Sequence, residues 1–557
     1  MLLSLSAAAL PTVTAFSTDP PHLTADIDVA PGGDLQAAID GAQPGDTIRL
    51  AAGAIYTGPF TLPAKAGSGT VLLRTSAPDS ALPPQGTRIS PPFFSALARV
   101  EANAGAAFAT APAAHDYRFL GLEISPTPGT FLYNVVLLGD GSEASVAQQP
   151  HNLVFERCYI HGDPTAGSRR GVALNGRDIT IVDSRLSDFK EVGADSQALA
   201  GWNGAGPFTI VNNYLEGAGE NLMFGGADPS VQDLVPADIV VRHNHFFKPL
   251  TWKVDDPSYA GTHWSVKNLF ELKNARRVLI EGNVFEQNWA DAQNGFSILL
   301  TVRNQDGTAP WSQVDRVTFQ DNILRHGGAG FNILGYDDNF PSQQTHDVRI
   351  RNNLLYDIAG GTWHGNGAWL QVLAATANVT ADHNTVNHTG NVITADGAPH
   401  TGFVFTNNIA AHNLYGVIGT NHGPGNDSIG VYFPALEFRR NVIPGASPSA
   451  YPGDNFYPPN MSDVGFADPA NRDYRLGDSS PYRNAATDGK DVGANIGEVE
   501  IATCGAVNGT YCAPSNPGGP GTPFGSLDAI PVLTLIAGVA VVAVLVVLLA
   551  RRRRREG

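Results

Sequence analysis

Two strand-like segments end in a cation followed by asparagine, and this pattern predicts the binding of an anion. NLFELKN carries Lys273 and ILLTVRN, the next such segment, carries Arg303. Side chains alternate along a strand, so both cations are expected to point outward while their apolar neighbours point inward. Like charges on adjacent strands cost stability, and an anionic ligand is the simplest explanation for placing them there.

This pair of cations suits β-elimination at a uronic acid. In that reaction a cation neutralises the substrate carboxylate, the proton beside it becomes acidic, and a base removes that proton. We expect Lys273 to be the base and Arg303 to neutralise the carboxylate or act as the acid. Tyr336, in FNILGY, is expected to assist as acid or alternative base.

Successive coils are expected to align further polar side chains on the same outer face. Adjacent strands lie about 4.8 Å apart, so equivalent positions form columns. The predicted catalytic column consists of Lys273, Arg303, Tyr336 and Gln371. The column beside it consists of Glu271, Thr301, Leu334 and Trp369. Glu271 and Gln371 are therefore candidates for substrate binding.

Tryptophan and lysine gather in one part of the chain. All seven tryptophans lie between Trp202 and Trp369, and four of the seven lysines lie between Lys248 and Lys273. Indoles stack on sugar faces, and cations suit a carboxylated or sulfated polymer in a protein of net charge −17. The predicted stacking residues are Trp252, Trp264, Trp289, Trp311 and Trp369. The alternative is that tryptophans anchor long loops and lysines solubilise them.

Other functions remain open for this face. A glycosidase needs two carboxylates across a cleft, and Glu271 with Asp337 or Asp338 is the best-placed set. The two aspartates would otherwise contact substrate. A non-catalytic adhesin or glycan-binding solenoid would use the face without turnover. The cationic patch is local and the chain acidic overall, which argues against a nucleic-acid partner.

A repeated frame, apolar-x-x-Asn-x-apolar, predicts the elements that position these residues. Its asparagines are Asn213, Asn244, Asn283, Asn322, Asn353, Asn384, Asn408 and Asn441, with Cys158 and Ser184 in the same position of two earlier repeats. Repeats of 24 to 39 residues are too short to bury an apolar face alone, which indicates a solenoid. We expect an all-β, right-handed, single-stranded parallel β-helix of about 10 to 12 coils. Each ladder residue should lie at a turn, where asparagine tolerates a left-handed backbone.

The flanking segments divide the chain further. Residues 26–118 should form an N-terminal cap and the first coils, 119–443 the β-helix and 444–512 a C-terminal cap. GGDLQAAIDGA is expected to form a short amphipathic helix in the N-terminal cap, and this opening resembles the pectate-lyase-like right-handed β-helix superfamily. The spacing of Cys504 and Cys512 predicts a small disulfide loop.

The two ends of the chain predict export to the cell surface. Residues 1–25 are a possible leader, and 513–528 form a Gly/Pro linker. Residues 529–550 are long and apolar enough for a transmembrane helix, and the Arg-rich tail 551–557 should be cytoplasmic. The solenoid would then act, as a monomer, on the extracellular face of the membrane.

The segments around Lys273 and Arg303 also carry a family resemblance. NLFELKN followed by LLTVRN resembles the active-site strands of alginate-lyase and chondroitinase-B-like polysaccharide lyases. The resemblance implies that Lys273 is the base, that Arg303 is the acid and that the substrate is an acidic polysaccharide. It also implies a Ca²⁺ site, for which Asn244 and Glu271 are the candidate ligands, because Asn268 and Val266 replace the acidic residues upstream of the lysine.

Overall fold

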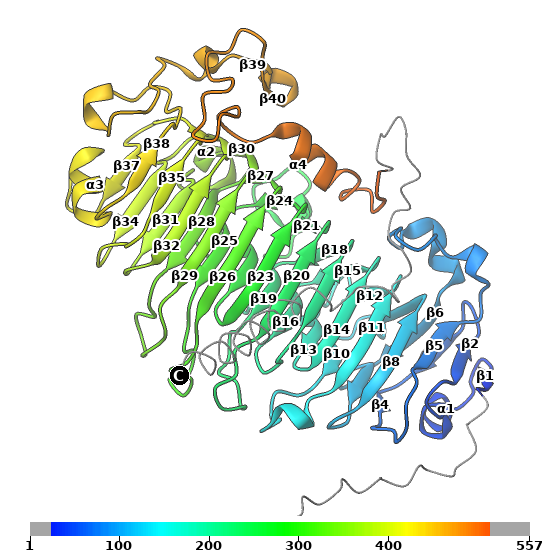
Figure 1. Ribbon diagram of the computed structural model, residues 1–557. Coiled ribbons are helices and arrows are strands. Elements are labelled where there is room, and N and C mark those ends of the chain that lie inside the picture. The colour runs from blue at the N-terminus through cyan, green and yellow to red at the C-terminus, as the bar shows by residue number, and fades with distance from the viewer. Residues whose placement is uncertain (1–23, 513–557) are drawn as a thin grey trace, which may run out of the picture. The chain divides into compact units, whose positions relative to one another are not determined.

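A computed structural model describes residues 24–512, and most of them wind into a parallel β-helix (Figure 1). Sheet A has 14 strands, from β1 (Asp26–Val29) to β38 (Glu437–Arg439). Sheet B has 12 strands, from β3 (Ile55–Thr57) to β36 (Ile409–Ala410), and sheet C has 12, from β4 (Phe60–Leu62) to β37 (Val417–Gly419). The predicted right-handed β-helix is therefore confirmed.

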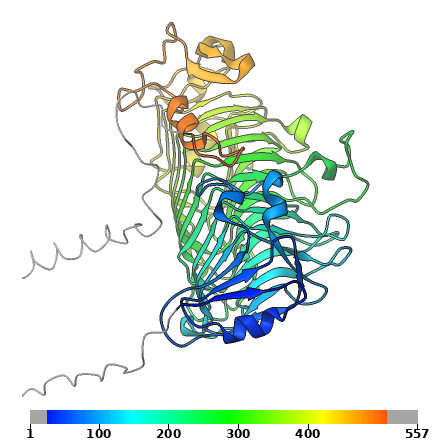
Figure 2. The same ribbon diagram turned by 90° about the vertical axis from the view of Figure 1, so that its right-hand side faces the viewer.

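Each coil passes through sheets A, B and C in turn. One coil consists of β23 (Ala275–Glu281), β24 (Val284–Asn288) and β25 (Phe296–Thr301). Its inward side chains Ile280, Phe285 and Ile298 are fully buried in one core that runs through the stack. Burying each such side chain contributes about 1.5–3 kcal/mol, so the stacking of coils holds the fold together (Figure 2).

Both open ends of the core are covered. The predicted N-terminal helix is α1 (Leu35–Gly41), which buries Leu35 and Ile39 and is capped by the side chain of Asp34. At the other end, α3 (Asn426–Tyr432) buries Ile429 and Tyr432 in the same core. After β38 the chain leaves the regular coils, and β39 (Phe466–Asp468) pairs antiparallel with β40 (Asp473–Leu476), whose Tyr474 packs in a separate cluster with Tyr356.

The corner between sheets A and B contains the asparagine ladder. The backbone N–H of Asn283 donates to Oδ1 of Asn322 (2.9 Å), and Nδ2 of Asn283 donates to the same oxygen (3.0 Å) and to the carbonyl of Val241 (2.9 Å). One expectation was wrong: the left-handed residue is the one before each ladder residue. His243 (φ 56°) precedes Asn244, for example, because that position makes the turn while the ladder side chain points inward.

A C-terminal strap, residues 484–511, runs back along the outside of this corner. The Asn495 N–H donates to Oδ1 of Asn352 (2.7 Å), and the Arg88 N–H donates to the carbonyl of Gly509 (2.7 Å). The strap includes α4 (Ile496–Thr503), which is orange in Figure 1. It therefore joins late coils to the first ones across the whole row of corner residues.

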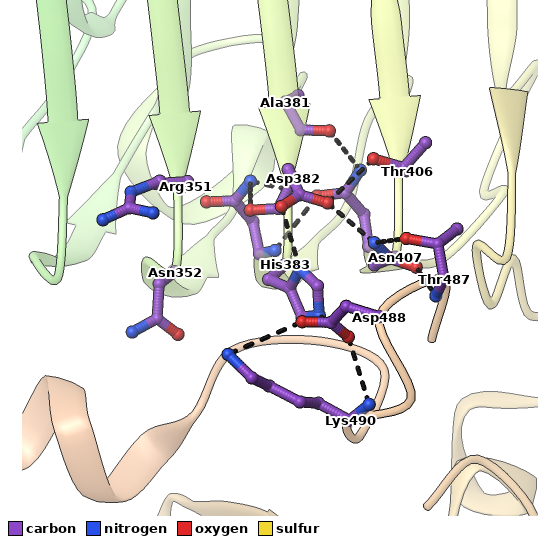
Figure 3. Close-up of polar contacts among 12 residues, drawn as sticks. Arg351, Asn352, Ala381, Asp382, His383, Thr406, Asn407, Thr487, Asp488 and Lys490 are labelled. Atoms are coloured by element: carbon purple, nitrogen blue, oxygen red, sulfur yellow. Dashed lines mark hydrogen bonds and ion pairs between the residues drawn. The ribbon is translucent and has the colours of Figure 1, made fainter. Parts of the chain in front are cut away.

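Charged and amide side chains fasten one end of the strap (Figure 3). Asp382 accepts hydrogen bonds from His383 (2.9 Å) and Asn407 (2.8 Å), and Oδ1 of Asn407 accepts the backbone N–H of Thr487 (2.8 Å). Asp488 of the strap lies 3.5 Å from His383. These contacts hold Asp382 ionised, since burial is outweighed by hydrogen bonds, above all from His383, that lower its pKa.

The predictions for the two ends of the chain concern residues that the structure does not describe. The linker, the apolar span 529–550 and the Arg-rich tail lie outside the described residues, as does nearly all of the possible leader. Within residues 24–512, no helix is long and apolar enough to cross a membrane. Cys504 and Cys512 are both disulfide-bonded, whereas the ladder residue Cys158 is a buried free thiol.

Candidate functional site

The outer face of sheet C has a concavity at the predicted site. Its volume is about 310 Å³, and β22 (Asn268–Leu272), β25 and β28 (Ala329–Leu334) form the floor. The lining residues are Glu271, Lys273, Ala292, Gln293, Asn294, Phe296, Leu299, Thr301, Arg303 and Asn332. The two cations singled out from the sequence therefore share one pocket, with residues 292–294 as a wall.

The predicted columns are displaced by two residues between β22 and β25 and by four between β28 and the next strand, whereas the predicted pairing of Thr301 with Leu334 is correct. Glu271 pairs with Leu299, Leu299 with Asn332 and Asn332 with Gln371, so Lys273 is level with Thr301 rather than with Arg303. Because strands alternate with a period of two, such even-numbered shifts leave Glu271, Lys273 and Thr301 on the predicted outer face, where all three line the pocket. Lys273 and Arg303 remain on adjacent coils, and the Arg303 N–H donates to the carbonyl of Lys273 (2.9 Å).

Lys273 and Glu271 form a loose ion pair in the pocket. The Lys273 ammonium lies 3.8 Å from Oε1 of Glu271, and the Thr301 hydroxyl donates to the same oxygen (3.4 Å). Oε2 of Glu271 and both polar atoms of Asn268 are buried without a hydrogen-bond partner among residues 24–512. Buried polar atoms are nearly always paired, so these atoms indicate a place where a ligand or water completes the site.

Arg303 is held by the two aspartates of GYDDN. Its guanidinium pairs with Asp337 (2.6 Å) and with Asp338, and the backbone N–H of Asn304 donates to the other oxygen of Asp337 (2.7 Å). Burial alone would lower the pKa of Arg303, but the hydrogen bonds that it donates to both carboxylates raise it. The Asp337 side chain is buried while that of Asp338 is 66% exposed, so Asp338 is the partner that an incoming anion can displace.

The remaining members of the predicted column lie at the edge. Tyr336 follows β28, is 41% exposed and does not line the pocket. Gln371, on β31 (Leu370–Leu373), donates to Oδ1 of Asn332 (3.2 Å) and so orients one pocket residue. The structure therefore places Lys273, Arg303 and Glu271 in one pocket. Gln371 contacts the pocket only through Asn332, and Tyr336 lies outside it.

The lysine cluster was misread as one exposed surface. The Lys248 ammonium is fully buried and donates to the carbonyls of residues 217–219. Lys253 pairs with Asp255, and Lys267 pairs with Asp195 (2.7 Å) and Glu220 (2.8 Å). Lys273 is thus the one member of the four that lines the pocket.

The tryptophans were also assigned the wrong role. Trp252, Trp264 and Trp289 are buried together with Trp363 in a cluster beneath the loops between sheets B and C. Trp369 was expected to point outward but is 0% exposed in the main core. Trp311 is half-buried, with its indole N–H on the carbonyl of Leu234 (3.0 Å). Anchoring of loops therefore explains these rings better than sugar stacking does.

The calcium ligands implied by the resemblance do not come together. Asn244 lies in the ladder, where its amide donates to Ile210 (2.8 Å) and Asn283 (3.0 Å), while Glu271 is on sheet C. Among residues 24–512, no three His, Cys, Asp or Glu side chains are placed to hold a metal. The carboxylates on this face instead surround the ammonium of Lys267. Burial alone would lower the pKa of Lys267, but the charges of these carboxylates outweigh burial and raise its pKa.

A polar column that begins successive strands of sheet C was missed. Arg170, Gln197, Glu220 and Asn268 pair across β13 (Arg170–Leu174), β16 (Gln197–Gly201), β19 (Glu220–Phe224) and β22. The Gln197 amide donates to Glu220 (2.8 Å), which in turn holds Lys267. The sequence pattern that could have predicted this column is a polar residue two positions before an inward apolar residue, and it occurs in RGVAL, QALAG, ENLMF and NLFEL.

No family model and no curated protein matches this chain. Among solved structures, the PL6 family alginate lyase AlyGC is 14% identical, with 90% of this chain and 60% of that chain covered and a TM-score of 0.49. The catalytic unit of a GH87 α-1,3-glucanase from Streptomyces thermodiastaticus is 13% identical, covering 81% and 72%, with a TM-score of 0.49. Pectate lyase Pel9A is 14% identical, covering 85% and 96%, with a TM-score of 0.31.

These comparisons concern the architecture. This chain spans 60% of the length of AlyGC, and the similar structures include both lyases and a glucanase. A fold does not determine a reaction, so activity has to be argued from the site. The chain is a right-handed parallel β-helix built from three parallel sheets.

Proposed function

We propose that this protein cleaves an acidic polysaccharide by β-elimination at a uronic acid residue. The observation that carries the proposal is the pocket on sheet C in which Lys273 and Arg303 come from adjacent coils. An anionic sugar would enter beside a loosely held ammonium and a guanidinium whose outer partner, Asp338, is exposed. The two cations would then attract the substrate carboxylate while the rest of the pocket orients the ring.

The reaction needs three groups, of which the pocket offers two and Tyr336, at its edge, is the candidate for the third. Arg303 binds the uronate carboxylate and stabilises the negative charge that develops on it as the adjacent proton leaves. Lys273, in its neutral form, takes that proton. The electron pair forms a carbon–carbon double bond as the glycosidic oxygen departs. Tyr336 returns a proton to that oxygen, since Arg303 stays protonated.

The carboxylates of the pocket are poorly placed for a hydrolase. Glu271 is 1% exposed, the Asp337 side chain is buried, and both are engaged by neighbours. Asp338 is the exposed carboxylate beside Arg303, whereas a glycosidase needs two that reach one glycosidic bond. The pocket therefore favours elimination over hydrolysis.

The proposal includes an extracellular location. The apolar span 529–550, followed by the Arg-rich tail, would anchor the chain with its solenoid outside the cell. A polymer substrate is met outside the cell, and the disulfide-bonded state of Cys504 and Cys512 suits an oxidising compartment.

The proposal is tested by following ultraviolet absorbance of unsaturated uronate. The protein is incubated with alginate, pectate, chondroitin and heparan in separate reactions. We expect absorbance to rise with at least one polymer, and Lys273→Ala to lower the rate about 100- to 10,000-fold, as for loss of a general base. New reducing ends without absorbance would indicate a hydrolase, and binding without any product would indicate a non-catalytic scaffold.

A further inference from the structure

Arg170 lies on the same sheet as the pocket but several coils closer to the N-terminus. It begins β13, in the column that continues through Gln197 and Glu220 to Asn268 on β22. Three strand spacings of about 4.8 Å separate β13 from β22, which is roughly 14 Å. A chain of several sugars that occupies the Lys273 pocket and follows the helix axis would reach Arg170.

The guanidinium of Arg170 has neutral partners. It donates to Oε1 of Gln197 (3.1 Å) and to Oδ1 of Asn134 (3.0 Å), and no carboxylate forms an ion pair with it within residues 24–512. The adjacent Arg169, by contrast, forms a two-pronged pair with Glu191 (2.5 and 2.7 Å). Burial, with a smaller effect of Arg169, lowers the pKa of Arg170. A nearby carboxylate that favours its charge, Glu220, is bonded to the amide of Gln197 rather than to Arg170 itself. A half-buried cation with no directly bonded carboxylate gains from an anionic ligand.

Aromatic rings flank this guanidinium on the same surface. Its carbon lies 5.5 Å from the ring centre of Tyr133 and 5.0 Å from that of Trp202. Tyr133 is 52% exposed and Trp202 is half-buried, in contrast to the buried tryptophans around the pocket loops. Rings of this kind offer a face to a sugar, while the guanidinium offers paired donors to a carboxylate or sulfate.

We propose that Arg170, Tyr133 and Trp202 form a second, non-catalytic subsite for an anionic sugar of the same polysaccharide. Arg170 binds the carboxylate or sulfate, and the exposed ring of Tyr133 supports the sugar. That one polysaccharide binds both at the Lys273 pocket and at Arg170 rests on the proposed function. Anion binding at Arg170 does not depend on cleavage. The subsite would raise the affinity for long chains over short ones.

The experiment measures binding without turnover. Calorimetry on the full-length Lys273→Ala protein compares an acidic trisaccharide with a decasaccharide, using unsulfated uronate oligosaccharides, sulfated galactan oligosaccharides that carry no uronate, and neutral cello-oligosaccharides. Adding Arg170→Gln or Tyr133→Ala is expected to weaken the binding of one class of anionic decasaccharide at least fivefold and to leave the trisaccharide unchanged. The class affected tells carboxylate from sulfate. Arg349→Gln, an exposed arginine on sheet A, is the matched control.

Other outcomes overturn the subsite. Unchanged affinity for the decasaccharide in both variants would do so. Equal losses of affinity for the trisaccharide and the decasaccharide, or the same loss of affinity in Arg349→Gln, would also do so. Thermal unfolding identifies a variant that is merely misfolded, and Tyr133→Ala, at an exposed side chain, then decides. Absence of lyase activity with length-dependent binding retained would reject the proposed cleavage alone. Lyase activity on polymer that Arg170→Gln leaves unchanged would reject the subsite alone.

Discussion

The corner between sheets A and B and the outer face of sheet C use buried polar groups in opposite ways. At the corner, each ladder amide meets the next; Asn322, for example, accepts from Asn283 and donates to the carbonyl of Ile280 (3.0 Å). On sheet C, the side chains of Asn268 and Glu271 have buried atoms with no hydrogen-bond partner in the part of the chain that the structure describes. Satisfied networks rigidify a fold, whereas unsatisfied groups cost stability unless a ligand pairs with them. The first region is therefore scaffold and the second is site.

Removing one asparagine from each region is the strongest way to test this contrast. Asn322→Ala should lower the free energy of unfolding by about 3 kcal/mol, because the N–H of Asn283 and the carbonyl of Ile280 lose their buried partner. Asn332→Ala, in the pocket, should change it by about 0.5 kcal/mol or less. Urea unfolding followed by circular dichroism measures both. Equal losses would show that the pocket is scaffold too.

The pH dependence of stability gives a second test at the corner. His243 lies beneath the strap, and burial lowers its pKa from 6.5 to about 4. The unfolded chain therefore binds the proton first, and stability falls as the pH drops from about 6.5 to about 4, by up to roughly 3 kcal/mol at about 1.4 kcal/mol per pKa unit.

His243→Asn isolates that contribution, because Asn212 shows that asparagine tolerates the same left-handed position. Stability measured by urea unfolding between pH 7 and pH 4 should become less steep in this variant. His263→Asn, on an exposed loop, is the matched control. An unchanged slope in His243→Asn would mean that protons do not loosen the strap at this residue.

The smallest expected effect concerns the exposed partner of Arg303. Asp338→Asn frees one side of the guanidinium for substrate and should lower KM two- to fivefold, since an exposed ion pair is worth up to about 1 kcal/mol. Initial rates on the best polymer measure this change. A collapse of kcat instead would assign Asp338 to acid or base catalysis and favour the glycosidase.

The scaffold could be predicted from sequence because its rule is local and repeated. The frame around Asn213 or Asn322 occurs once per coil, so its regularity reports both the turn and the stacking. One ladder residue, Asn455, was still missed: it accepts the backbone N–H of Asn441 (2.9 Å) but comes after only 14 residues. The strap was missed because its contacts join residues far apart in sequence, such as Arg88 and Gly509.

The site could be predicted only in part. Alternation placed Lys273 and Arg303 on the correct face, but matching their Lys-Asn and Arg-Asn ends displaced the register by two residues. Burial of Trp289 and pairing of Lys267 depend on how loops fold over the sheet, which composition does not encode. The two-residue shift had little consequence because both cations still reach one pocket.

Replacing Lys273 by arginine tests the central claim most directly, because arginine keeps the positive charge but stays protonated and cannot serve as a base. The measurement is ultraviolet absorbance of unsaturated uronate beside binding of the same polymer, with Lys490→Arg in the exposed strap loop as the matched control. We predict that Lys273→Arg loses product formation while binding is retained and the control is unaffected. Product formation at the wild-type rate in Lys273→Arg would contradict the account.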